Sequence, residues 1–186
     1  MKQLIALFFV FAVAACKHGT TNTLSPEQEQ TLLKTGDSIA VSVQALLQQN
    51  VAKAMQAGGP VYAVAFCNEK AAFLTDSMST LHGTFIQRLS DKNRNPANEI
   101  KDTADHTAWK KLSTKQEAFV QTDAHGKRYF YKPITISMPA CLKCHGGRAD
   151  IQDSTRKVIL GKYPYDKAVD YQMGDLRGMW KIGVGS

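Results

Sequence analysis

Two cysteines three residues apart, followed at once by a histidine, occur at Cys141, Cys144 and His145. This C-x-x-C-H pattern is the attachment sequence of c-type haem. Side chains at positions i and i+3 lie on one face of a helical turn, so both sulfurs can reach the vinyl groups of one porphyrin. The histidine is then held beneath the iron, where an imidazole nitrogen can ligate it. We therefore predict that the chain folds around one covalently attached haem c.

Other uses of paired cysteines fit the sequence less well. A redox-active C-x-x-C pair normally begins a helix in a thioredoxin-like βαβ unit, and the sequence predicts no such unit. A zinc site needs two further ligands, and no second Cys/His pair at finger spacing occurs in the sequence. Chance occurrence of the pattern is a third alternative, and the export signal at the start of the chain argues against it, because haem is attached covalently outside the bacterial cytoplasm.

The first fifteen residues are predicted to be a signal peptide. Lys2 precedes an unbroken apolar run over residues 4–15. As a helix this run rises only about 18 Å, short of the ~30 Å hydrocarbon core of a membrane. Its end, Val13-Ala14-Ala15-Cys16, resembles the bacterial lipobox, in which the cysteine is acylated and becomes the new N-terminus. Cys16 is therefore the predicted lipidation site, and ordinary signal cleavage nearby is the alternative.

This interpretation divides the chain into a signal peptide, a lipidated tether over residues 16–24 and a haem domain over residues 25–186. Acyl chains anchor a protein by ~0.8 kcal/mol per buried methylene. Lys17 follows the cysteine where an aspartate would direct retention at the inner membrane, and by resemblance to that sorting rule the outer membrane is favoured. We predict a lipid-anchored protein on the periplasmic face of a bacterial membrane.

Composition excludes several broad classes. Four cysteines in 186 residues are too few for a disulfide scaffold, and 44% hydrophobic residues are too many for a disordered chain. The formal net charge of +7 permits an acidic partner, but Lys and Arg are spread beside Asp and Glu with no arginine-rich block. A nucleic-acid partner is therefore not predicted.

Helical periodicity dominates the first part of the mature chain. It follows a capping-box start at Ser25-Pro26-Glu27-Gln28, and Gly58-Gly59-Pro60 ends it. A second helical stretch covers residues 61–81. The first helix is long for a single domain, so we expect it to cross the domain surface or to pair with the same helix of a second chain in a homodimer.

Short strands are predicted further along. The stretch 128–138 is rich in aromatic and β-branched residues and follows a five-residue connection that suits a hairpin. Helices followed by strands predict an α+β domain with an antiparallel sheet. The predicted strands are 84–89, 117–121, 128–138 and 176–184, the predicted helices are 102–112 and 163–173, and 91–96 is a predicted loop.

Cys67 is the fourth cysteine, and it has no disulfide partner if the other three are modified as predicted. An unpaired thiol in an oxidising compartment has to be buried or occupied. The apolar residues 63–66 and 71–72 around it suit a small buried side chain on a helix. The position opposite the motif histidine is otherwise open to His82, His106, His125 or Met138, or it has no protein ligand at all.

Four ordered motifs extend the pattern over residues 28–184. Together they resemble a family of periplasmic c-type haem domains with a PAS-like fold, which also occurs as the extracytoplasmic part of bacterial signalling proteins. The motifs are Gly59-Pro60 with Phe66-Cys67-Asn68-Glu69-Lys70-Ala71; Arg88-Leu89-Ser90 with Arg94-Asn95-Pro96-Ala97-Asn98; the C-x-x-C-H segment with Gly146; and Gly161-Lys162-Tyr163-Pro164 with Asp166, Ala168, Tyr171, Gly174-Asp175 and Arg177-Gly178.

The resemblance implies a PAS-like antiparallel sheet with flanking helices, and it implies Cys67 as the iron ligand opposite His145. It also places Arg94 and Asn95 near the haem, where Arg88 or Arg94 pairs with a propionate. A surface ion pair is the alternative for these arginines. A thiolate ligand lowers the reduction potential of iron and binds less well after reduction, so a released Cys67 would open a site for a small gas.

We therefore expect a redox or gas sensor module whose partner is a small gas or a redox protein. The alternative is a membrane-tethered electron-transfer cytochrome that works through its haem edge. An enzyme such as a peroxidase is not expected, because no distal acid–base motif occurs in the sequence.

Overall fold

The long N-terminal helical region folds back on itself at two glycines. A computed structural model describes residues 24–185, and its first element, α1 (Pro26–His82), begins with the predicted capping box at Ser25. Gly58 and Gly59 break the helical backbone, and the φ of +65° at Gly59 is one that glycine adopts without strain. The two predicted helices and the break between them are confirmed. The predicted signal peptide, the tether up to residue 23 and Cys16 lie outside the described residues.

A four-stranded sheet follows, formed by β1 (Ile86–Leu89), β2 (Phe119–Thr122), β3 (Arg128–Thr135) and β4 (Leu176–Gly183). The strand order is β1-β4-β3-β2 and every neighbouring pair is antiparallel. The last strand of the chain therefore lies in the middle of the sheet. The α+β class, the antiparallel sheet and all four strands are confirmed, with β3 ending before Met138 because a helix begins at Pro139.

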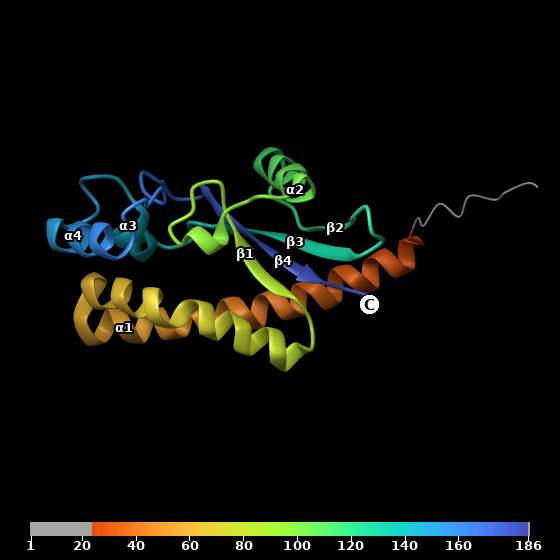
Figure 1. Ribbon diagram of the computed structural model, residues 1–186, viewed down its shortest axis with the longest axis horizontal. Coiled ribbons are helices and arrows are strands. Elements are labelled where there is room, and N and C mark those ends of the chain that lie inside the picture. The colour runs from red at the N-terminus through yellow and green to blue at the C-terminus, as the bar shows by residue number, and fades with distance from the viewer. Residues whose placement is uncertain (1–23, 186) are drawn as a thin grey trace, which may run out of the picture.

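Helices cover both faces of the sheet. Both halves of α1 lie along one face, and α2 (Thr103–Thr114) lies over the other (Figure 1). Ile39 and Val43 from the first half of α1 share a core with Met78 from the second half and with Phe130 and Trp180 of the sheet. The first half of α1 thus lies across the domain, as expected for one of the two predicted arrangements. The second half of α1 packs in the same core.

Two short helices, α3 (Pro139–His145) and α4 (Asp153–Lys162), lie together at one end of the sheet, beside the turn of α1 (Figure 1). The prediction of a helix over 163–173 is wrong, because the helix α4 ends at Lys162, before that segment. The backbone N–H groups of Asp170 and Tyr171 donate to the carbonyl oxygens of Gly146 and His145 at 3.0 Å each, where a helix would bond within itself. The segment is therefore fixed against the end of α3. Within residues 24–185 no helix is long and apolar enough to cross a membrane.

Candidate functional site

The helix α3 carries the whole C-x-x-C-H motif on fewer than two turns. Pro139 occupies its first position, and Cys141 and Cys144 follow one turn apart. Both cysteines are half-buried and free of disulfides. The motif does lie in a helix, but the sheet beside it is wholly antiparallel, so the structure has no thioredoxin-like βαβ unit.

The imidazole of His145 is held in one tautomer. Its Nδ1 lies 2.9 Å from the carbonyl oxygen of Ala168. A carbonyl oxygen only accepts, so Nδ1 carries the proton and donates it, and Nε2 of the neutral ring keeps a lone pair. Burial lowers the pKa of His145 well below its usual value, and the guanidinium groups of Arg177 and Arg94 lower it further. His145 is thus a neutral imidazole of the form that ligates metals.

Arg177 of β4 stands beside this histidine. Its Nε lies 3.4 Å from Nδ1 of His145, which already donates its proton elsewhere, so the contact is electrostatic. The Nη1 of Arg177 donates to Ser90 Oγ at 3.2 Å and to the carbonyl oxygen of Lys92 at 3.3 Å. The ring of Tyr171 meets the imidazole edge-on at 6.3 Å between centroids. These contacts fix the histidine from the sheet side.

Arg94 forms a buried ion pair with Asp166 beside the end of α3. Its Nε and Nη2 donate to the two carboxylate oxygens of Asp166 at 3.1 and 3.0 Å, and the two side chains are 10% and 2% exposed. The same Nη2 lies 2.7 Å from the carbonyl oxygen of Cys144 and 3.1 Å from that of Ala168. Arg94 therefore ties the end of α3 to the segment that supplies the histidine's acceptor.

Cys67 lies in the second half of α1, on the side of the helix that faces the motif. Val64, one turn earlier, packs in the same apolar cluster as Cys144. Burial raises the pKa of the Cys144 thiol to about 11, Arg94 opposes the rise, and the neighbouring thiols of Cys67 and Cys141 add to it. Burial also raises the pKa of Cys67 itself. The fold thus brings Cys67 close to a cysteine 77 residues further along the chain.

Arg88 of β1 also lies within electrostatic reach of Cys67. Burial lowers the pKa of its guanidinium, and the acidic groups of Cys67 and Tyr163 oppose this effect. Its Nη2 reaches the carbonyl oxygen of Ala71 at 3.5 Å, and its Nε is buried without a hydrogen-bond partner in residues 24–185. A buried cationic donor without an acceptor fits a site that receives an anionic group.

The remaining candidate residues are placed elsewhere or in other roles. His82 closes α1 and its Nε2 lies 3.1 Å from Ser42 Oγ, whereas His106 lies in α2 and His125 in the β2–β3 turn. Met138 is the residue before α3 and is 44% exposed. Asn95 caps the short helix η1 (Pro96–Asn98) by accepting from the N–H of Ala97, so its predicted place near a haem stays a prediction.

Sequence reasoning assigned no role to Asp166, Ala168, Tyr171 or Arg177, although all four stand in the last of the quoted motifs. Ala168 acts through its carbonyl oxygen, which every residue has, so no side-chain pattern marks it. Asp166 and Arg177 become recognisable only when their partners, Arg94 and His145, are known to be close. In the described part of the chain no group of three or more His, Cys, Asp and Glu side chains is arranged to hold a metal ion.

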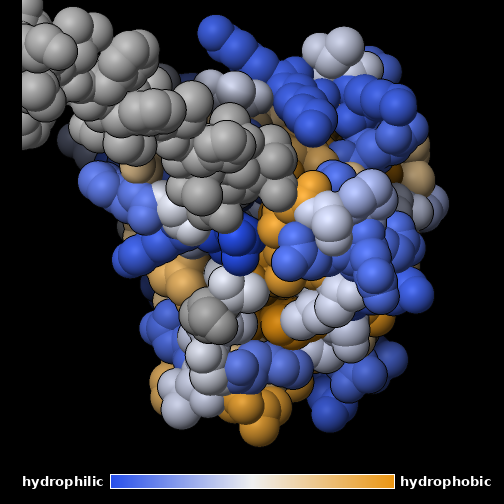
Figure 2. Space-filling model, turned by 90° about the vertical axis from the view of Figure 1, so that its right-hand side faces the viewer, coloured by the Kyte–Doolittle hydropathy of each residue, from blue (hydrophilic) through white to orange (hydrophobic). Residues whose placement is uncertain are grey.

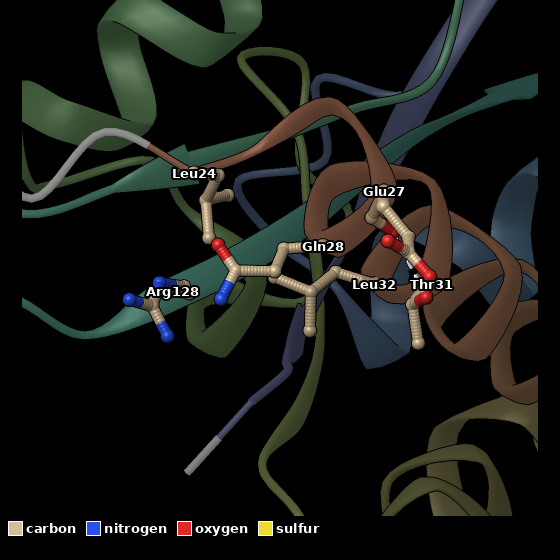
Figure 3. A pocket seen from close by; sticks show the side chains of 6 residues that line it. All are labelled: Leu24, Glu27, Gln28, Thr31, Leu32 and Arg128. Carbon is tan, nitrogen blue, oxygen red and sulfur yellow. Dashed lines mark hydrogen bonds between the residues drawn. The ribbon is translucent and has the colours of Figure 1, made fainter.

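Two surface grooves lie away from the motif. One of about 330 Å³ lies between the start of α1, at Leu24, Gln28 and Leu32, and Arg128 of β3 (Figure 3). The second groove, of about 300 Å³, runs between the first half of α1 and β3, with Trp180 among its lining residues.

The end of the molecule that faces the viewer in Figure 2 carries a narrow apolar strip flanked by hydrophilic side chains.

A scan against protein-family models matched residues 20–185 to the family described as Tll0287-like. This chain belongs to the Tll0287-like family. The matched region contains all the helices and strands described above, so Cys67, Arg94 and the motif lie within the family's part of the chain. A search of curated proteins found no match.

The Tll0287-like fold is also seen in a solved structure, the crystal structure of the cyanobacterial haem protein Tll0287. It superposes with a TM-score of 0.61 at 23% sequence identity, covering 88% of this chain and 98% of that one. At this identity the likeness shows the fold. The predicted family resemblance is confirmed by the Tll0287-like match together with this structure.

Proposed function

We propose that this chain binds one haem c through thioether bonds to Cys141 and Cys144, with His145 and Cys67 as the two axial ligands. In this proposal the protein is an extracytoplasmic redox or gas sensor module. It is anchored through Cys16 to the periplasmic face of a bacterial membrane, and the outer membrane is favoured. It signals to a separate partner protein or responds to a small gas, and it has no catalytic activity of its own.

One observation carries the proposal: α3 presents two free thiols one turn apart, beside a histidine whose Nδ1 donates to a carbonyl oxygen so that Nε2 keeps its lone pair. Cys67 lies within electrostatic reach of Cys144. Two cysteines followed by a histidine are what covalent haem c requires, and Cys67 is the residue that we propose as the second iron ligand. The family match and the haem protein of the same fold support haem binding.

The charges of the site fit the same cofactor. Arg88 and Arg94 act electrostatically on Cys67, and Arg177 and Arg94 act on His145. Arg177 in turn lies in the field of Arg88, Arg94 and the carboxylate of Asp166. Three guanidinium groups face the buried carboxylate of Asp166 and the half-buried carboxylate of Asp150, which accepts the N–H of Gly147 at 2.9 Å, so positive charge is in excess among them. Haem propionates and a thiolate ligand are anions, and their binding would balance this excess.

Haem would supply a one-electron iron couple whose ferric form favours an anionic sulfur ligand. The residues of the chain have separate tasks around it. Ala168 keeps Nε2 of His145 unprotonated, and Arg94 and Asp166 hold Ala168 in place. Because one ligand is anionic and the other neutral, the pair responds to a change in the charge of the iron, which supports a sensor.

The test compares wild type with Cys67→Ala by absorption and paramagnetic resonance spectroscopy. We expect a six-coordinate ferric thiolate signature in wild type, its loss in the variant, and carbon monoxide binding by the reduced wild-type protein. An unchanged spectrum in Cys67→Ala would exclude Cys67 as a ligand. A couple that keeps both ligands in both oxidation states and exchanges electrons rapidly with a soluble cytochrome would favour the electron-transfer alternative.

A further inference from the structure

Arg88 carries a buried guanidinium with an unused donor on the Cys67 side of the site. Its contact with the carbonyl oxygen of Ala71, at 3.5 Å, is long, and Ala71 lies one helical turn after Cys67 in α1. The Nε of Arg88 has no hydrogen-bond partner in residues 24–185. Because an unpaired charged donor is costly to bury, an acceptor from outside the described chain is expected here.

Two acidic side chains lie within electrostatic reach of Arg88. Cys67 and Tyr163 both act electrostatically on Arg88, and Tyr163 is 7% exposed. Arg94 also acts on Cys67, but its Nε and Nη2 are already bonded to Asp166 and to backbone carbonyl oxygens. Arg88 is therefore the arginine acting on Cys67 whose buried Nε has no hydrogen-bond partner in residues 24–185, and a cationic donor of this kind suits a negatively charged acceptor.

We infer that Arg88 is an anion-binding residue on the Cys67 side of the site, where its Nε–H donates to a small inorganic anion when the Cys67 sulfur is not coordinated. The inference rests on the proposed function, since it takes a haem held by α3 with Cys67 on the side opposite His145. A hydrogen bond from a guanidinium to an anion is about twice as strong as one between neutral groups. Arg88 would thus select anionic over neutral ligands of the iron.

The test uses the ferric holoprotein of Cys67→Ala, in which the distal sulfur is absent without any redox step. Azide, an anion, and imidazole, a neutral ligand, are titrated separately while the absorption spectrum is followed. We expect Cys67→Ala/Arg88→Gln to bind azide at least about tenfold more weakly than Cys67→Ala, with the affinity for imidazole unchanged. Arg88→Met fills the same buried space and serves in place of Arg88→Gln if that variant does not fold.

Arg156 offers a matched control. It is a half-buried arginine in α4 whose Nε and Nη2 also have no hydrogen-bond partner within residues 24–185. We expect Cys67→Ala/Arg156→Gln to bind azide as tightly as Cys67→Ala, because Arg156 is not among the groups that act on Cys67.

Two outcomes overturn the inference. Equal losses of azide and imidazole affinity in the Arg88 variant would show that Arg88 only maintains the shape of the site. An unchanged azide affinity would show that its donor serves another acceptor, such as a propionate. Haem staining after denaturing electrophoresis separates these results from failure of the proposed function: wild type without covalent haem removes both, whereas covalent haem with equal azide affinities removes the inference alone.

Discussion

The Nδ1 of His145 lies 2.9 Å from the carbonyl oxygen of Ala168, 23 residues further along the chain. This hydrogen bond decides which imidazole nitrogen keeps a lone pair, and a backbone carbonyl is a common partner of metal-bound histidines. The position of the carbonyl depends in turn on Asp166, which accepts the N–H of Ala168 at 2.9 Å, and on Arg94.

Breaking the Arg94–Asp166 pair is expected to destabilise the protein. Both side chains are buried, so Asp166→Ala would leave an uncompensated buried guanidinium, at a cost of about 3–5 kcal/mol. Chemical denaturation of wild type and variant measures the free energy of unfolding. The control is Glu117→Ala, which breaks an exposed pair with Lys115 and is expected to leave stability unchanged. Equal effects of the two variants would contradict the role assigned to Asp166.

Alanine variants of the four histidines in residues 25–186 are expected to differ in their absorption spectra. In the proposed haem protein, His145→Ala would change the absorption spectrum, because the proposed proximal nitrogen is lost. His82→Ala, His106→Ala and His125→Ala are expected to keep the wild-type spectrum. Absorption spectra of the purified proteins check the set, and a spectral change in any of the last three would reopen the choice of ligand.

Tyr131 is expected to make stability depend on pH in the alkaline range. Burial, followed by its hydrogen bond of 2.7 Å to Asp105 Oδ1, raises the pKa of this tyrosine. Because its pKa is higher in the folded than in the unfolded protein, Tyr131 contributes fully to the free energy of unfolding below the unfolded pKa of about 10. This contribution is lost progressively as the pH rises above that value.

Tyr131→Phe tests this dependence. The variant is expected to lose about 1–3 kcal/mol at neutral pH, since Asp105 loses a buried donor, and to show a shallower decline of stability above pH ~10. Denaturation curves at neutral and alkaline pH measure both effects. The control Tyr165→Phe alters an 83% exposed ring and should follow wild type throughout. A Tyr131→Phe curve parallel to wild type would contradict the prediction.

Gly36→Ala is expected to destabilise the contact between α1 and the sheet. A Cβ at Gly36 would collide with the Phe130 side chain, which is fully buried, so the cost of overpacking is about 1–3 kcal/mol. Gly161→Ala in α4 is the matched control: a Cβ there meets nothing within 4 Å, and a gain of about 0.5–1 kcal/mol is expected. Thermal unfolding compares them, and a neutral Gly36→Ala would be incompatible with this packing.

Cys16→Ser tests the predicted lipid anchor. Without the acylated cysteine the protein is expected to leave the membrane fraction and appear in the soluble periplasmic extract. Cys67→Ser is the control and should stay with the membranes. Wild type and Cys16→Ser both in the soluble extract would favour ordinary signal cleavage.

Local patterns predicted much of the fold because their causes are local. The capping box at Ser25, the break at Gly58 and Gly59 and the hairpin before Arg128 each depend on a few neighbouring residues, and each is confirmed. The segment 163–173 was misassigned for the opposite reason. Its backbone bonds to the end of α3, a partner that no window of the sequence contains.

Spacing and periodicity along the chain predict the C-x-x-C-H motif, the helix break, the antiparallel α+β class and the family. Which side chains surround the motif depends on tertiary packing. The fold bonds Arg94 to Asp166, turns the carbonyl of Ala168 toward His145 and brings Cys67 within electrostatic reach of Cys144. These contacts join residues 23 to 77 positions apart, and they arise because the packing of α1 and the last loop against α3 brings distant segments together.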